Sequence, residues 1–151
     1  MRERIVEFLA TAAYAGRSSR APGTMGSLWG LVFGYALSGL SAAGGAAVLA
    51  AAVAAAVWVG AEAERAAGGK DPRHIVCDEV VGMMTAVYLL PATTGTLILA
   101  FSLFRFFDIL KPPPVSTMER VFSGGAAVVF DDVAAGLCAN AAARLVLWLA
   151  G

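Results

Sequence analysis

The amino-acid sequence predicts an all-α protein, a helical bundle embedded in a membrane. Its 151 residues are 59% hydrophobic and only 15% charged, whereas a water-soluble domain usually carries about a quarter charged residues. The charges are also confined to a few stretches, and apolar segments separate those stretches. Because a chain of this length usually forms one domain, we expect residues 1–151 to make a single membrane-embedded unit.

Five apolar segments are the candidates for membrane-spanning helices. They are residues 28–40, 43–61, 80–90, 96–105 and 133–150. A helix needs about twenty apolar residues to span a bilayer, and the third and fourth segments are shorter. They reach that length only if neighbouring ionisable residues lie at or below the headgroups, namely Asp78, Glu79, Arg105 and Asp108. Ionisable groups at such depth are energetically costly and are usually functional.

Two N-terminal features precede these segments. Residues 1–14 mix early charges with apolar side chains, which predicts a short amphipathic helix on the membrane surface. A loop is expected at 16–27, where Gly23 and Gly26 allow a close backbone approach to a ligand. Arg17 and Arg20 in this loop would face an anion.

The distribution of charge predicts the orientation in the membrane. Of the 11 basic and 11 acidic residues, all but Arg144 lie in the N-terminal stretch, in 62–79 or in 105–132. We expect a water-exposed loop at 62–78 and a polar connection at 112–132. Five spans place all three charged regions on one side, and the uncharged turns on the other. Because basic residues concentrate in the cytoplasm, the N-terminus is expected inside and the C-terminus outside.

Carboxylates gather on the predicted cytoplasmic face. Asp78-Glu79 and Asp131-Asp132 each open an apolar segment, and Asp108 lies at the end of another. One carboxylate of each pair would cap a helix N-terminus, but capping does not require two. Several carboxylates without equal positive charge repel each other unless a divalent cation holds them. Oxygen ligands alone favour Mg²⁺ over zinc, so these residues are candidate Mg²⁺ ligands.

Cations stand close to these carboxylates in the sequence. Arg105 and Lys111 lie three residues on either side of Asp108, which places all three on one helix surface. This is either a local ladder of ion pairs or part of a binding site. Together with Arg20 and Arg73, the two cations suit phosphate oxygens. Carboxylates, a hard metal and cations facing a membrane indicate phosphoryl chemistry on a lipid headgroup, with a metal-activated water as the preferred attacking group.

Two other classes of protein fit part of the pattern. A cation-coupled transporter would bind a moving ion with the same acids, but its usual inverted repeats and broken helices are absent from the sequence. A purely structural membrane protein would not need doubled carboxylates. His74, Cys77 and Cys138 do not form a zinc-ligand set or a disulfide framework. The net charge of zero gives no reason to expect a nucleic-acid partner.

Four motifs, in this order, resemble the phosphatidylglycerophosphatase A family. They are 22–27 (PGTMGS), 75–79 (IVCDE) with Gly82, 104–108 (FRFFD) with Lys111, Pro112 and Pro114, and Asp131-Asp132 with Ala135 and Gly136. Together they cover the chain nearly from end to end. One departure is Ala126, which follows the glycine pair at 124–125 where the family usually has another glycine.

The resemblance implies a multi-pass phosphatase of the bacterial cytoplasmic (inner) membrane, with its active site facing the cytoplasm. Such an enzyme uses Mg²⁺ to convert phosphatidylglycerophosphate into phosphatidylglycerol and phosphate, a step of phospholipid biosynthesis. The implied catalytic and metal-binding residues are Asp78, Glu79, Asp108, Asp131 and Asp132. The expected substrate-binding residues are Arg20, Thr24, Ser27, Arg105 and Lys111. The expected partners are the phospholipid substrate and the membrane, and the oligomeric state is left open.

Overall fold

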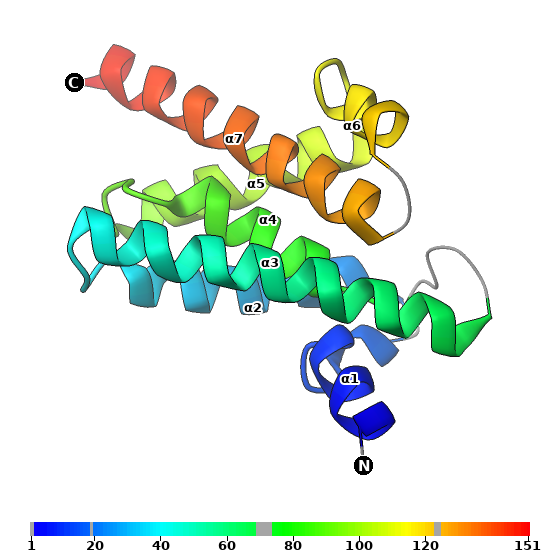
Figure 1. The fold of residues 1–151 in the computed structure, drawn as a ribbon. Helices are drawn as coiled ribbons and strands as arrows, with labels where there is room; N and C mark the ends of the chain where they lie inside the picture. Colours follow the sequence, from blue (N-terminus) through cyan, green and yellow to red (C-terminus); the bar gives the residue numbers. More distant parts are fainter. Residues whose placement is uncertain (1, 19, 69–73, 123–124) are drawn as a thin grey trace.

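The computed structural model describes residues 2–18, 20–68, 74–122 and 125–151. Every regular element within these ranges is a helix (Figure 1), which confirms the predicted all-α class. The elements are α1 (Arg2–Ala10), the 3-10 helix η1 (Ala15–Arg17), α2 (Pro22–Leu37), α3 (Ala42–Ala67), α4 (Cys77–Val87), α5 (Thr94–Leu110), α6 (Val115–Val121) and α7 (Gly125–Ala150).

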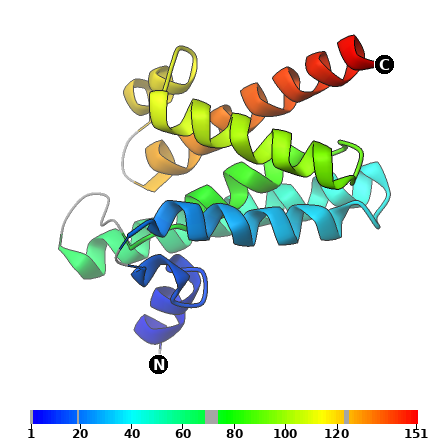
Figure 2. The same cartoon turned by 180° about the vertical axis from the view of Figure 1, so that it is seen from behind.

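The short helix α4 is the centre of the bundle. Helices α2, α3, α5 and α7 all pack against it (Figures 1 and 2), and all its residues except Glu79 and Val80 are buried. Glycines make this close packing possible. A methyl group at Gly136 of α7 would overlap the carbonyl oxygen of Gly82, and one at Gly30 of α2 would overlap that of Val80. Small residues at these crossings therefore set the spacing between helices.

The C-terminal end of α4 is closed by two side chains from α7. Asn140 Nδ2 donates hydrogen bonds to the backbone oxygens of Ala86 at 2.9 Å and Tyr88 at 2.8 Å. Arg144 donates to the backbone oxygen of Leu89 at 3.0 Å and to Asn140 Oδ1 at 2.8 Å. These bonds satisfy carbonyl groups at a helix end, which lack partners within the helix. They also account for Arg144, the one charge that lies outside the three charged regions of the sequence.

Two helices, α3 and α7, are long and apolar enough to cross a membrane. Only a minority of the residues in their apolar windows are buried inside the protein, and the others are half-buried or exposed. Helices α2, α4 and α5 contain 16, 11 and 17 residues, or about 24, 17 and 26 Å of length. They are shorter than a hydrocarbon core of about 30 Å. A crossing by all five segments, and the orientation of the termini, therefore stay predictions.

Several element boundaries differ from the predicted ones. The expected loop at 16–27 is partly helical, because α2 begins at Pro22, whose fixed φ suits a first helical turn. The expected loop at 62–78 also begins as helix, since α3 continues to Ala67. Glu62 and Arg65 form an ion pair of 2.9 Å on its last turns, and such pairs support a helix in water. Helices α6 and α7 occupy much of the connection expected at 112–132.

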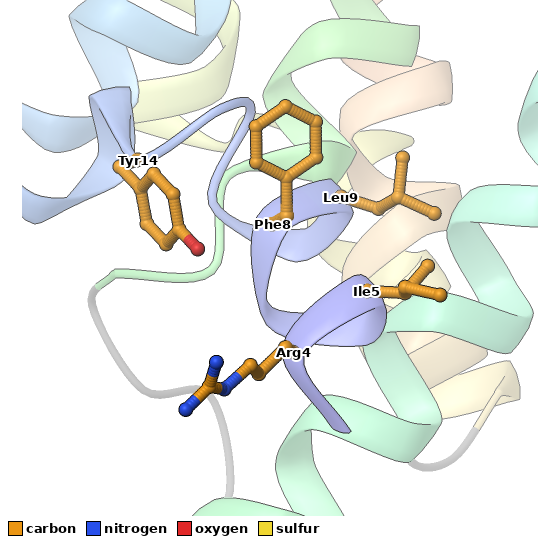
Figure 3. A pocket seen from close by; sticks show the side chains of 5 residues that line it. All are labelled: Arg4, Ile5, Phe8, Leu9 and Tyr14. Atoms are coloured by element: carbon orange, nitrogen blue, oxygen red, sulfur yellow. The ribbon is translucent and has the colours of Figure 1, made fainter. Parts of the chain in front are cut away.

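Helix α1 lies at one end of the bundle and presents an apolar face (Figure 3). Ile5, Phe8 and Leu9 are 53, 44 and 47% exposed, and with Arg4 and Tyr14 they line a cavity of about 650 Å³. Apolar side chains beside a cation are typical of a helix at a membrane surface. The predicted amphipathic helix is confirmed over α1 only. Its expected continuation to residue 14 is wrong, because the backbone at 12–14 turns with positive φ.

Candidate active site

The first turn of α4 places two carboxylates at the centre of the bundle. Asp78 is buried, and its Oδ1 accepts a hydrogen bond of 3.0 Å from the backbone N–H of Glu79. Asp78 therefore takes part of the capping role expected from the sequence. The neighbouring carboxylate does not, because Glu79 Oε2 is buried and has no hydrogen-bond partner among the described residues.

The second acidic pair, Asp131 and Asp132, lies on α7 and is buried. We expected this pair to open a helix, and that expectation is wrong because α7 already begins at Gly125. Asp131 Oδ1 accepts a hydrogen bond of 2.9 Å from the backbone N–H of Asp132. Asp132 Oδ2 is buried without a hydrogen-bond partner in the described part of the chain. A capping role does not explain why these acids are buried.

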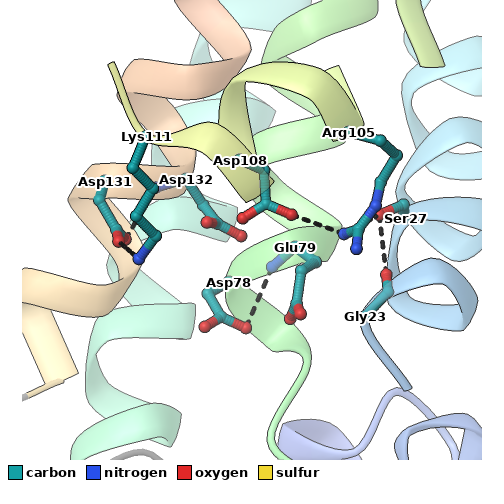
Figure 4. A network of polar contacts seen from close by, with 9 residues as sticks. All are labelled: Gly23, Ser27, Asp78, Glu79, Arg105, Asp108, Lys111, Asp131 and Asp132. Atoms are coloured by element: carbon teal, nitrogen blue, oxygen red, sulfur yellow. Dashed lines mark hydrogen bonds and ion pairs between the residues drawn. The ribbon is translucent and has the colours of Figure 1, made fainter. Parts of the chain in front are cut away.

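The C-terminal part of α5 and the residue that follows it supply a third carboxylate and two cations (Figure 4). Arg105 NH1 donates to Asp108 Oδ2 at 2.6 Å and to Ser27 Oγ on α2 at 3.3 Å. Lys111 ends α5 in a left-handed conformation, with φ of 43°, and its Nζ pairs with Asp131 on α7. The predicted contact between Arg105 and Asp108 is therefore confirmed, whereas the expected place of Lys111 on the same helix surface is wrong, because this residue lies beyond the last residue of α5 and pairs with Asp131. The contacts extend beyond a ladder on one helix, since they connect α5 to both α2 and α7.

Three of the carboxylates are close enough to share a cation. One oxygen each from Asp78, Glu79 and Asp132 lies within 4.8 Å of the others. Buried charges require compensation, and two of these residues carry an oxygen that receives no hydrogen bond from the part of the chain that the structure describes. A metal ion would supply the missing partner to both. With oxygen as the only donor type, the cluster fits a hard cation rather than a soft one.

All the predicted site residues except Ser27 line a single cavity of about 430 Å³. Ser27 is fully buried. Its hydroxyl donates to the backbone oxygen of Gly23 at 2.8 Å and accepts from Arg105. Ser27 therefore helps to hold the guanidinium in position. Arg73, which we also expected near the phosphate, lies outside the described residues. The cavity brings the predicted residues together without assigning their roles.

The cavity wall also contains residues that were not among the predicted catalytic, metal-binding or substrate-binding residues. Ile75 and Val128 line it with apolar surface, and neither differs in the sequence from ordinary core residues. Gly23 forms another part of the wall, where a methyl group would overlap Glu79 Oε1. The close backbone approach predicted at Gly23 is therefore an approach to Glu79, a carboxylate of the site itself.

The chain matches the model of the phosphatidylglycerophosphatase A family over residues 8–147. It belongs to this family. The match includes every residue of the cavity described above. The predicted family is confirmed, as is the prediction that the chain is an enzyme of this type. Among members of the phosphatidylglycerophosphatase A family, the protein of Haemophilus influenzae is 34% identical over 89% of this chain and 83% of its own length.

Two further relatives share most of the chain. The phosphatidylglycerophosphatase A of Escherichia coli is 32% identical over 85% of this chain and 76% of its own length. A protein of Bacteroides thetaiotaomicron named "Putative phosphatidylinositol-3-phosphatase" is 34% identical over 95% of this chain and 94% of its own. These phosphatase names give no support to the alternative of a cation-coupled transporter. No solved structure matches the chain significantly.

Proposed function

We propose that this protein hydrolyses the terminal phosphomonoester of phosphatidylglycerophosphate to give phosphatidylglycerol and phosphate. The observation that carries the proposal is the buried carboxylate cluster, which shares one cavity with Arg105 and Lys111. Membership of the phosphatidylglycerophosphatase A family supports this substrate. We place the reaction at the cytoplasmic face of the bacterial inner membrane, in a chain that crosses the membrane several times.

The carboxylates divide into two groups by their contacts. Asp78, Glu79 and Asp132 would hold Mg²⁺, because their oxygens converge and, among the described residues, two of the three have an oxygen without a hydrogen bond. Asp108 and Asp131 instead pair with the cations of the cavity. When bound, Mg²⁺ supplies positive charge to the phosphate oxygens and favours the ionisation of water at neutral pH. A carboxylate of the cavity accepts the proton of the attacking water.

The cations orient the phosphate. The guanidinium of Arg105 is held by Asp108 and Ser27, so its remaining N–H groups are fixed as a planar fork that matches phosphate oxygens. Lys111 adds a single positive charge from the end of α5. Arg20 and Thr24 line the same cavity from the start of α2 and the residues before it. The phosphate of the substrate would therefore contact these cations, and Asp78, Glu79 and Asp132 would hold the metal in the same cavity.

Phosphate release from phosphatidylglycerophosphate in mixed micelles tests the proposal. The purified protein should release phosphate with Mg²⁺ and should stop when a chelator is added. Asp78→Asn should lower turnover by about a hundredfold or more. Glu3→Gln, which removes an exposed carboxylate of α1, is the matched control and should retain full activity. If the unmodified protein released no phosphate, the proposed substrate would be wrong. If release continued in the presence of chelator, the proposed metal requirement would be wrong.

The Bacteroides thetaiotaomicron relative adds a second candidate substrate, phosphatidylinositol 3-phosphate, because its similarity covers 95% of this chain. The two lipids share one chemical unit. In each, the phosphomonoester and the phosphodiester of the lipid stand on carbons 3 and 1 of a polyol. The carbon between them carries a hydroxyl group in both. The same cavity can therefore receive the monoester of either lipid.

A further inference from the structure

A second polar cavity adjoins the one that holds the acids. It has a volume of about 530 Å³, and its lining includes Arg17, Ser18, Arg20 and His74. Arg20 and Pro22 line both cavities, so the two are neighbours across the residues that precede and begin α2. None of the residues proposed for metal binding lines the second cavity. The proposed reaction does not use it.

The charge of this second cavity is opposite to that of the first. Arg20 is exposed and has no ion-pair partner within the described ranges. Arg17 pairs with Glu7, the carboxylate of this lining, and its guanidinium lies 4.9 Å from the ring centroid of Tyr14. These contacts fix Arg17 in place, and a guanidinium has five donors, so the pairing leaves others for a ligand. The cavity is therefore a basic site beside an acidic one.

We infer that this basic cavity binds the phosphodiester of the lipid whose phosphomonoester enters the acidic cavity. The inference rests on the proposed function. A diester keeps one negative charge, which is repelled by carboxylates and attracted by arginines. Arg20 stands at the wall between the two sites, where it can contact both phosphates of one headgroup. The apolar face of α1 adjoins Glu7 and Arg17, and such a face lies at the bilayer surface, at the depth of a lipid phosphodiester.

The class of ligand follows from this pair of sites. The recognised unit is a phosphomonoester and a phosphodiester on carbons 3 and 1 of a polyol, which glycerol and inositol lipids both supply. Phosphatidic acid has the monoester but no diester beyond it, so it would fill only one cavity. An inositol lipid with its monoester on carbon 4 would present the two phosphates at the wrong spacing. Arg17 and Arg20 are thus specificity residues for the distance between two phosphates.

Calorimetric titration of the full chain in detergent with Mg²⁺ tests this inference directly. The probes are glycerol 1,3-bisphosphate and its isomer glycerol 1,2-bisphosphate, which have the same charge and in which a second phosphomonoester takes the place of the phosphodiester. The 1,3 isomer should bind about tenfold more tightly, which is about 1.4 kcal/mol. Arg17→Gln and Arg20→Gln should each remove most of this preference. Arg65→Gln, an exposed arginine of α3, should keep it. Equal binding of the two isomers, or a preference that survives in both variants, would overturn the inference.

Binding and turnover separate this inference from the proposed function. A protein that prefers the 1,3 isomer but releases no phosphate from phosphatidylglycerophosphate would refute the reaction and leave the second site standing. A protein that hydrolyses the lipid and binds both isomers equally would refute the second site alone. In an active protein, Arg17→Gln, which changes a residue of the second cavity only, should raise KM about tenfold with little change in kcat, because the diester contact is the same in the ground and transition states. Inositol 1,3-bisphosphate should likewise bind more tightly than the 1,4 isomer, and equal binding would exclude inositol lipids.

Discussion

Arg105 NH1 lies 2.6 Å from Asp108 Oδ2, and neither side chain is more than 20% exposed. The same nitrogen donates to Ser27 Oγ on α2, so one guanidinium connects two helices at the wall of the acidic cavity. Exposed ion pairs contribute little to stability, but this pair is largely shielded from water. Its geometry fixes the direction of the remaining donors of Arg105.

The first prediction concerns the shape of that cation. Arg105→Lys keeps the charge but loses the planar fork, so kcat/KM should fall about tenfold or more, or about 1.4 kcal/mol of transition-state stabilisation. The melting temperature in detergent should change little. Arg65→Lys is the matched control on an exposed pair. Asp108→Asn should also lose activity. If the double variant Arg105→Gln/Asp108→Asn, which removes both charges, regained it, the two residues would mainly neutralise each other, and phosphate binding would rest on Lys111 and Arg20.

The second prediction concerns the uncompensated carboxylate Asp132. In chelator, Asp132→Asn should raise the melting temperature, because it removes a buried charge that is crowded by other acids. The unmodified protein should gain stability on adding Mg²⁺, by about 2.7 kcal/mol at a hundredfold excess over Kd. The variant should show little such gain and little activity. An Mg²⁺ shift that is undiminished in Asp132→Asn would remove this residue from the metal site.

The third prediction tests the crossing of α4 and α7. Gly136→Ala introduces a methyl group that overlaps the carbonyl oxygen of Gly82, and overpacking of this kind costs about 1–3 kcal/mol. Gly95→Ala is the matched control, since a methyl group at this position of α5 meets no atom within 4 Å. Denaturation in detergent should show a loss for the first variant and none for the second. Equal stability of the two would mean that the helices can separate at no cost.

The fourth prediction concerns orientation in the membrane. Thr94 and Thr117 are exposed and belong to opposite sides of the predicted topology. In a background with Cys138→Ala, where the remaining Cys77 is buried, Thr94→Cys should react with an impermeant thiol reagent added to intact cells. Thr117→Cys should react only after the membrane is opened. The reverse pattern would place the acidic cavity outside the cell and contradict the proposed cytoplasmic reaction.

Much of the site could be predicted from the sequence because its chemistry is unusual for an apolar chain. Carboxylates are costly in such a setting, so the acids of α4, α5 and α7 stand out by position alone, and the structure brings them into one cavity. The all-α class followed from composition for the same reason. The membrane crossings are harder to predict from the sequence, because a helix that is enclosed by other helices and a helix that is exposed to lipid contain the same apolar residues.

Other features depend on contacts that no local pattern contains. The start of α7 at Gly125, ahead of the acidic pair, is stabilised by packing, since a methyl group at Gly125 would lie 2.6 Å from the backbone nitrogen of Ala61 on α3. The role of Asn140 and Arg144 depends on the end of α4, which lies more than fifty residues earlier in the chain. The basic cavity likewise joins His74 to Arg17 and Arg20. The separation of these residues along the sequence does not indicate how close they lie in the folded protein.

Helix α4 has no free side, because four helices surround its 11 residues. A movement of one end of α4 therefore moves the other end as well. Asn140 holds the C-terminal end by bonds to Ala86 and Tyr88, while the N-terminal end carries Asp78 and Glu79. A shift of the helix along its axis at one end displaces the carboxylates at the other relative to Asp132. The alignment of the three carboxylate oxygens therefore also depends on Asn140 and Arg144, neither of which lines the acidic cavity.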